Sequence, residues 1–215
     1  MLNLPEKTLY DKRIPKSKFY EKLKMGSKLK EKFVRQIDYI IWKHKLSRHT
    51  VNITPTPEVQ EIQIFEVYLK QRELAQDVLE SIDRAIPYPI LFVLVYGKEA
   101  RLAVAYKKRS QQHENRFVVD SYFYSEWRNE LSLDLLKGLT LKAVYENLLK
   151  SLISVSPGSG QALEQAIEKQ KELDKLKREI GALEAKIARE RQFNRKVKYN
   201  IELQEKKKEL QRLIE

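Results

Sequence analysis

Two carboxylates and a lysine near residue 65 are the side chains of this sequence best suited to chemistry. Glu61, Glu66 and Lys70 lie in or beside a segment rich in β-branched and aromatic residues, which predicts a strand. Carboxylates and a lysine on one strand can hold Mg²⁺ and a scissile phosphate, as in metal-dependent nucleases. Such sites usually place the lysine two positions after an acidic residue, whereas Lys70 follows Glu66 by four. We therefore favour the alternative, paired charges on an exposed or edge-strand face.

The sequence carries none of the motifs that mark common enzymes. A Gly-rich phosphate loop, a GxSxG motif, an HExxH zinc motif and a dinucleotide-binding fingerprint are missing. The three histidines lack metal-ligand spacing, and the lack of cysteine excludes disulfides, thiolate chemistry and Cys-rich zinc sites. The sequence thus predicts no cofactor and no metal, and it favours a protein that is not an enzyme.

The positive charge of the chain is concentrated near its N-terminus. The 215 residues carry a net charge of +12, of which residues 1–56 contribute +9. A basic segment of this kind favours a polyanionic partner, because each neutralised phosphate releases counterions. We expect nucleic-acid contact without sequence-specific readout, through residues that include Lys12, Arg13, Lys16 and Lys18. The alternative is a solvated surface that only keeps the protein soluble.

Aromatic residues beside an arginine form a second candidate for contact with bases. Residues 122–128 read Tyr-Phe-Tyr-Ser-Glu-Trp-Arg. Aromatic rings can stack on bases. Because Phe123 and Trp127 are large and apolar, we favour the alternative that they close the end of the core.

The elements that must position these residues predict an α+β domain over residues 1–155. Residues 1–16 read as an extended arm within a basic, helical part (1–56), and a Pro-rich stretch separates that part from the sheet region (57–155). Helices are expected over 17–25, 33–45, 73–86 and 139–153, and strands over 59–69, 90–95, 100–107 and 116–124. These elements predict about four mostly antiparallel strands packed with helices, with a hairpin turn at residues 97–99.

A long helical tail is expected after a flexible linker at residues 156–160. In residues 161–215, apolar side chains recur at steps of three and four residues, which is typical of a coiled coil. A helix this long needs a packing partner, so the tail is expected to pair with itself, with a second copy or with another protein. The expected partner-binding residues are Leu173, Leu176, Ile180, Leu183, Ile187, Phe193, Asn200, Leu203 and Leu210.

The register of this coiled-coil pattern is broken once. The step from Ile187 to Phe193 is six residues, whereas the positions before and after it repeat every seven. Two interpretations stay open: a single rod with a register discontinuity, or a helical hairpin that turns near residues 189–194. In either case we expect Asn200 to lie in the contact between helices, where a polar residue fixes register.

Nothing in the sequence predicts insertion into a membrane. The first residues lack the apolar run of a signal peptide. The longest apolar stretch, residues 90–96, is far shorter than the roughly 20 residues that span a bilayer. We therefore expect a cytoplasmic protein.

Several short stretches are distinctive enough to compare with known families. The most specific are Arg13-Ile14-Pro15-Lys16 and the Gln-Phe-Asn-Arg-Lys-Val run at 192–197. The others are Leu4-Pro5, Phe19-Tyr20, residues 61–66, Ile82-Asp83, residues 85–87, residues 90–92, Glu126-Trp127, and Asn200 with Glu202-Leu203. Together they resemble an uncharacterised prokaryotic domain-of-unknown-function family over nearly the whole chain. The resemblance implies genes beside helicases and DNA methyltransferases, in loci of restriction or antiphage type, and it supplies no catalytic residues.

These observations favour a non-catalytic accessory or scaffold subunit of a prokaryotic DNA-processing defence complex. Its tail would bind a protein partner, such as a helicase or methyltransferase, or a second copy. Its basic N-terminal region would bind nucleic acid. The alternatives are a metal-dependent nuclease that uses Glu61, Glu66 and Lys70, and a homo-oligomeric scaffold with no nucleic-acid role.

Overall fold

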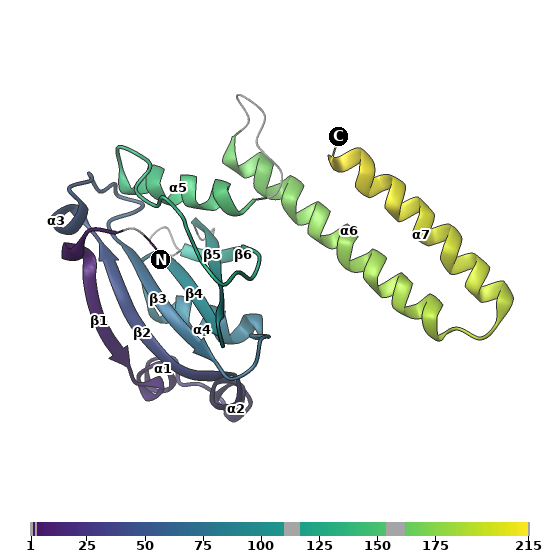
Figure 1. Cartoon of the computed structure of the whole chain (residues 1–215), viewed down its shortest axis with the longest axis horizontal. Helices are drawn as coiled ribbons and strands as arrows, with labels where there is room; N and C mark the ends of the chain where they lie inside the picture. The colour runs from purple at the N-terminus through teal and green to yellow at the C-terminus, as the bar shows by residue number, and fades with distance from the viewer. Residues whose placement is uncertain (1, 3, 110–116, 154–161, 215) are drawn as a thin grey trace. The chain divides into compact units, whose positions relative to one another are not determined.

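The computed structural model describes residue 2 and residues 4–109, 117–153 and 162–214. The chain divides into two compact units, Met1–Leu152 and Ile153–Glu215. The first unit is an α+β domain built on one six-stranded sheet, and the second is helical (Figure 1). In chain order the first unit contains η1 (Glu6–Thr8), β1 (Leu9–Ile14), α1 (Lys16–Lys22), α2 (Ser27–Gln36), β2 (Ile37–Leu46), α3 (Arg48–Val51), β3 (Ile62–Leu69), α4 (Gln76–Ala85), β4 (Ile90–Tyr96), β5 (Glu99–Arg109), β6 (Phe117–Tyr124) and α5 (Leu141–Leu152).

The six strands lie side by side in their order along the chain. Neighbouring strands are antiparallel except β3 and β4, which are parallel, so the sheet is mixed. A parallel pair requires a crossover connection, and α4 supplies it. The predicted hairpin between β4 and β5 is confirmed, and Gly97 turns it with a φ of +59°, which glycine adopts at no steric cost.

The sheet has two more strands than the sequence predicted, and both come from the first 56 residues. The expected extended arm contains β1, and the expected helix over 33–45 ends at Gln36, where β2 begins. Ile37 and Ile40 are three residues apart, which suggested a helix, yet both are buried in the same core. A β-bulge between Ile37 and Tyr39 explains this, because an extra residue lets positions three apart share one face of a strand.

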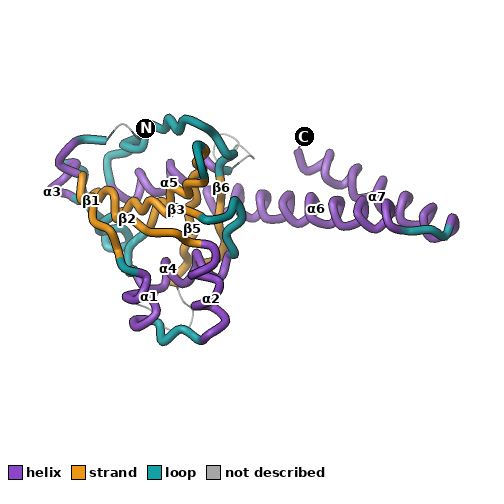
Figure 2. Tube along the Cα trace, turned by 60° about the horizontal axis from the view of Figure 1, so that its bottom comes forward, coloured by secondary structure: helices purple, strands orange, loops and turns teal. Residues whose placement is uncertain are grey.

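Three helices cover one face of the sheet (Figures 1 and 2). Phe19 of α1, Phe33 of α2 and Ile82 of α4 are buried against strand residues that include Phe65 and Phe92. Alternate strand positions point to the opposite face, where α5 contacts β5 and β6. Tyr39 and Tyr68 lie on that opposite face, since they alternate with the core residues of β2 and β3, and both stay partly exposed.

The second unit is a hairpin of two helices, α6 (Leu163–Arg189) and α7 (Phe193–Ile214) (Figure 1). Of the two interpretations of the tail, the structure therefore has the hairpin. Its interior holds Ile180, Leu183 and Leu203. Ion pairs join the helices at 3.0 Å between Lys206 Nζ and Glu179 Oε2, and at 2.9 Å between Lys207 Nζ and Glu184 Oε1.

The linker expected at 156–160 lies outside the described residues. None of the helices in the described part of the chain combines the length and the apolar character that crossing a membrane requires.

Candidate nucleic-acid interface

Three cationic side chains gather where β1 and β3 end and β2 begins. Lys16, at the start of α1, donates from Nζ to the carbonyl of Ile37 at 2.9 Å. Lys70, just past the end of β3, donates from Nζ to the carbonyl of Val34 in α2, also at 2.9 Å. Arg13 lies near the end of β1 and is exposed. We call Arg13, Lys16 and Lys70 the basic cluster.

The members of the basic cluster repel one another. Burial lowers the pKa of Lys16, and the positive charges of Lys70 and Arg13 lower it further. The carboxylate of Asp38 acts in the opposite direction. A surface that holds like charges together in this way is stabilised when an anion neutralises them, so the cluster is suited to a phosphate group.

Two tyrosines extend the basic cluster across the sheet. The guanidinium carbon of Arg13 lies 4.7 Å from the centre of the Tyr39 ring, within the range of a cation–π contact. The rings of Tyr39 and Tyr68 stack with their centres 4.2 Å apart. Tyr68 donates from its hydroxyl to Glu66 Oε2 at 3.1 Å, and burial together with the Glu66 carboxylate raises the pKa of Tyr68. Tyr68 therefore stays protonated at neutral pH and can act as a hydrogen-bond donor.

More positive charge surrounds the cluster on α1, α2 and the turn between them. Residues 16–36 contain eight lysine or arginine residues and two glutamates. Lys32 forms an ion pair with Asp77 of α4. Among the described residues, no carboxylate lies within 4.0 Å of the six exposed cations here, which are Lys18, Lys22, Lys24, Lys28, Lys30 and Arg35. These six, together with the basic cluster, form what we call the basic end.

The structure separates the four cations that the sequence analysis selected for nucleic-acid contact. Arg13 and Lys16 belong to the basic cluster, and Lys18 is exposed in the first turn of α1. Lys12 instead lies over the ring of Tyr10, whose own ring packs on Trp42 of the helix-covered core.

The sequence analysis missed two features of this site. The sequence placed Lys70 in a possible site with Glu66, whereas the Lys70 ammonium donates to a backbone carbonyl of α2. It also missed the Tyr39–Tyr68 stack, because that contact exists only when residues 37–46 form a strand.

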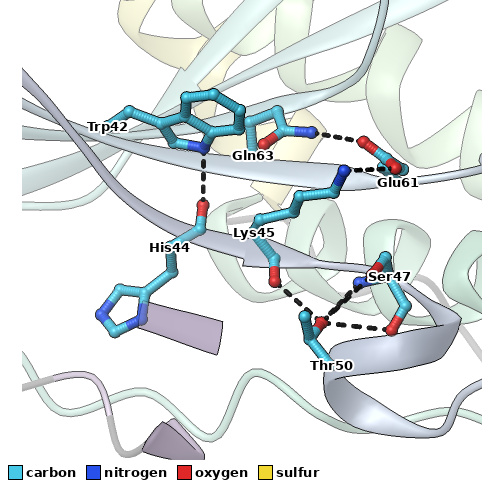
Figure 3. A network of polar contacts seen from close by, with 7 residues as sticks. All are labelled: Trp42, His44, Lys45, Ser47, Thr50, Glu61 and Gln63. Atoms are coloured by element: carbon cyan, nitrogen blue, oxygen red, sulfur yellow. Dashed lines mark hydrogen bonds and ion pairs between the residues drawn. The ribbon is translucent and has the colours of Figure 1, made fainter. Parts of the chain in front are cut away.

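The three nuclease candidates do not converge on one site. Glu61 precedes β3 and Lys70 follows it, so nine extended residues place them roughly 30 Å apart. Figure 3 shows Glu61 held by two neighbours, with Lys45 Nζ at 2.7 Å from Oε1 and Gln63 Nε2 donating to Oε2 at 3.0 Å. Within the described residues, no three aspartate, glutamate or histidine side chains are grouped closely enough to hold a metal ion.

The aromatic run at residues 122–128 lies largely in the core. Tyr122 and Phe123 are buried, and Trp127 packs against the helix-covered core. Arg101 lies between two rings, with its guanidinium carbon 4.6 Å from the centre of Tyr124 and 4.9 Å from that of Trp127. The structure thus places this run as core closure, the alternative that the sequence favoured.

Several of the tail residues selected for partner binding face the interior of the hairpin. Ile180, Leu183 and Leu203 are buried there, and Ile187 and Leu210 pack against them. Leu173 and Leu176 are buried as well. Two residues differ. Phe193 is 78% exposed, and the expected place of Asn200 between the helices is wrong, because Asn200 is exposed and donates to the Lys196 carbonyl of its own helix.

Comparison with known proteins gives a family but no functional relative. No curated protein matches the chain, and no solved structure does either. The family model that matches is DUF4391, described as a domain of unknown function, and it covers residues 2–210. Because the match spans nearly the whole chain, this protein belongs to the DUF4391 family.

Proposed function

We propose that this protein is a non-catalytic accessory subunit that binds nucleic acid through the basic end and a protein partner through its helical hairpin. The observation that carries the nucleic-acid part is the convergence of Arg13, Lys16 and Lys70 from three separate segments. None of the three has a carboxylate within 4.0 Å among the described residues. Their charges are therefore available to phosphates.

The chemistry of the site favours backbone contacts over base readout. Lysine and arginine neutralise phosphates and fix the position of a nucleic acid without reading its sequence. The six exposed cations of α1 and α2 widen this surface beyond the basic cluster. Tyr39 adds a hydroxyl group that can donate to a phosphate or sugar oxygen, whereas the hydroxyl proton of Tyr68 is already donated to Glu66. We therefore expect binding that depends on salt and differs little between sequences.

The cellular setting that we propose is a DNA-processing defence complex of restriction or antiphage type, in the cytoplasm of a prokaryote. This part rests on the resemblance of Arg13-Ile14-Pro15-Lys16 and of residues 192–197 to a family whose genes neighbour helicases and DNA methyltransferases. In that setting the hairpin would dock such a partner, and the basic end would hold the nucleic acid on which the partner acts.

A salt titration tests the nucleic-acid part directly. The fluorescence anisotropy of labelled duplex and single-stranded DNA would be measured with the full chain between about 50 and about 200 mM salt. We expect the affinity to fall steeply with salt. Arg13→Gln and Lys70→Gln should each weaken binding to all sequences alike and reduce the log–log salt slope by about 1. Lys150→Gln removes the same charge from an exposed position of α5, so it serves as the control and should change the slope little. Binding that does not weaken as salt rises would overturn the proposal.

Two further measurements separate the alternatives. A metal-dependent nuclease would cleave plasmid DNA in the presence of Mg²⁺ and lose that activity in Glu66→Ala, whereas we expect no cleavage by either protein. A homo-oligomeric scaffold would self-associate in light scattering yet fail to bind DNA at low salt. Either result would replace the accessory role with the corresponding alternative.

A further inference from the structure

One row of side chains crosses the face of the sheet opposite α1, α2 and α4. The register pairs Tyr39 of β2 with Tyr68 of β3, and Tyr68 with Val95 of β4. Val95 pairs with Ala100 of β5, and an isolated bridge pairs Ala100 with Arg128. Paired residues on neighbouring strands point to the same face of a sheet, so these five side chains follow one another across it. We call them the cross-strand row.

The two tyrosine rings of the cross-strand row stack along the direction of the row. Their centres are 4.2 Å apart and their planes differ by 18°. This separation is close to the roughly 4.8 Å between neighbouring strands, so a ring that continued the stack would lie over the next strand. Tyr39 meets Tyr68 on the β3 side and the guanidinium of Arg13 on the β1 side, so both faces of its ring are covered.

The outer face of the Tyr68 ring, toward β4, is the end of this stack. Among the described residues, no ring other than Tyr39 stacks on Tyr68 and no cation lies over it. Tyr68 is partly exposed, and the next two positions of the row carry the small side chains of Val95 and Ala100, which are partly exposed as well. A flat aromatic group above Val95, about 5 Å across the sheet from Tyr68, would therefore extend the stack.

The charges beside the cross-strand row are of both signs, so the aromatic rings select the ligand more than the net charge does. Arg13 lies at one end, and at the other end Arg128 is exposed, with no carboxylate within 4.0 Å in the part of the chain that the structure describes. Glu66 accepts the hydroxyl proton of Tyr68 at 3.1 Å, and Asp38 is exposed in β2. A fitting ligand thus presents a flat uncharged ring to Tyr68 and anionic groups to the two arginines, as a nucleotide base between its phosphates does.

We infer that the outer face of Tyr68 stacks an unpaired base, so that this protein binds single-stranded nucleic acid in preference to duplex. The faces of bases inside a duplex are covered by their neighbours, whereas a single strand can place a base on an aromatic side chain. Every base has an aromatic face, so this contact adds affinity without reading sequence. The inference rests on the proposed nucleic-acid function and names the form of nucleic acid that the site takes.

The alternative role of the tyrosine pair is to hold β2 against β3. Aromatic pairs on neighbouring strands do stabilise sheets. If this were the only role, Tyr68→Leu would lower the stability of the first unit and change the binding of single-stranded and duplex DNA by the same factor. Base stacking instead predicts a loss confined to the single strand.

Two labelled oligomers of equal length test the inference with the full chain, by fluorescence anisotropy. One is oligothymidylate, and the other consists of abasic sugar-phosphate units, which keep the phosphates and lack the bases. We expect the wild type to bind oligothymidylate about tenfold more tightly, within the range of about 5- to 150-fold that one stacked base supplies. This comparison needs no variant, so it decides the question even if a substitution disturbs the fold.

Three variants then assign the preference to the Tyr68 ring. Tyr68→Leu should abolish the preference for oligothymidylate and leave the affinity for duplex DNA unchanged. Tyr68→Phe keeps the ring and should keep the preference. Tyr96→Leu is the matched control, because Tyr96 is 37% exposed, follows Val95 in β4 and lies on the other face of the sheet. It should behave as the wild type does.

The outcomes separate this inference from the proposed function. Equal affinity of the wild type for the two oligomers, or an unchanged preference in Tyr68→Leu, would overturn the base-stacking role and leave the phosphate contacts of the basic end in place. Lys70→Gln should weaken both oligomers by a similar factor and preserve the preference, because it removes a phosphate contact alone. A wild type that bound neither oligomer nor duplex DNA at low salt would overturn the proposed function, and this inference with it.

Discussion

Lys107 Nζ lies 2.8 Å from Asp83 Oδ1, and the two side chains keep only 8% and 0% of their accessible surface. Tyr122 donates to the second carboxylate oxygen at 2.6 Å. Burial raises the pKa of Asp83, while the Lys107 ammonium and the Tyr122 hydroxyl act against that rise. The contact joins α4 to β5 and β6 across the helix-covered core.

Removing one partner of this buried pair should destabilise the first unit strongly. Lys107→Met leaves the carboxylate of Asp83 buried without its cation, a change that typically costs about 3–5 kcal/mol. The free energy of unfolding would be measured in urea. The double variant Lys107→Met, Asp83→Leu should lose much less stability, because no uncompensated charge then stays in the core. A double variant as unstable as the sum of the two single variants would contradict this interpretation.

His44 should make the fold sensitive to mild acid. Thr8 donates its hydroxyl proton to the carbonyl of Pro5 at 2.6 Å, so Nδ1 of His44, 2.9 Å from the same hydroxyl oxygen, must be the donor in that contact. Burial, and then the charge of Lys43, lowers the pKa of His44 in the folded chain. The unfolded chain therefore binds the proton more readily, and stability should fall as the pH drops below about 6.5.

This dependence is checked by measuring the free energy of unfolding between pH 7.5 and pH 5, since the decrease should become smaller in His44→Gln. The equivalent change at exposed His49 serves as the control. A His44→Gln variant with the pH dependence of the wild type would assign the decrease to other groups.

Two glycines should respond to alanine in opposite directions. Gly138 has a φ of +144°, and a Cβ there would lie 2.9 Å from Val144 N and 2.9 Å from Ala143 Cβ. Gly138→Ala should therefore lower the melting temperature of the first unit. Gly181 lies inside α6 with nothing within 4 Å of an added Cβ, so Gly181→Ala should stabilise the hairpin by about 0.5–1 kcal/mol. Calorimetry of both variants tests the pair, and a loss of stability in Gly181→Ala would refute the second expectation.

The two faces of α7 should differ in their effect on stability. Leu203 is buried between the helices, and Leu203→Ala should cost about 2–5 kcal/mol because it leaves a cavity. Phe193→Ala, a larger truncation on an exposed side chain, should cost little. Hydrogen exchange of the α6 and α7 amides reports the difference directly. Equal loss of protection in the two variants would mean that Phe193 also supports the hairpin.

Much of the fold follows from local patterns in the sequence. The apolar run of β4, the turn at Gly97 and the helical spacing of α5 all indicate their structures, because each depends on neighbouring residues alone. β2 was missed for a physical reason, since its bulge imposes on Ile37 and Ile40 a spacing of three that imitates a helix. β1 was missed because a strand at the edge of a sheet needs few apolar residues, and five of its six are exposed.

The candidate site was only partly predictable, because it depends on contacts between distant segments. The excess of basic residues near the N-terminus drew attention to Arg13 and Lys16, and the structure places both in the basic cluster. No local pattern could show that Lys70 joins them, since that contact requires the end of β3 to meet α2. The step of six residues before Phe193 allowed a hairpin but could not decide for it without the packing of Leu203 on α6.

The order of the strands has a consequence for how this chain is made. Because β1 to β6 are neighbours in the order of synthesis, the strand with which each new strand pairs has already been synthesised. β3 and β4 are the one parallel pair of this sheet, and α4, which connects them, is synthesised before β4. We expect the sheet to assemble strand by strand during translation. Force measurements on stalled nascent chains would then show pulling in several steps that begin well before α5 is released, and a single late step would argue against stepwise assembly.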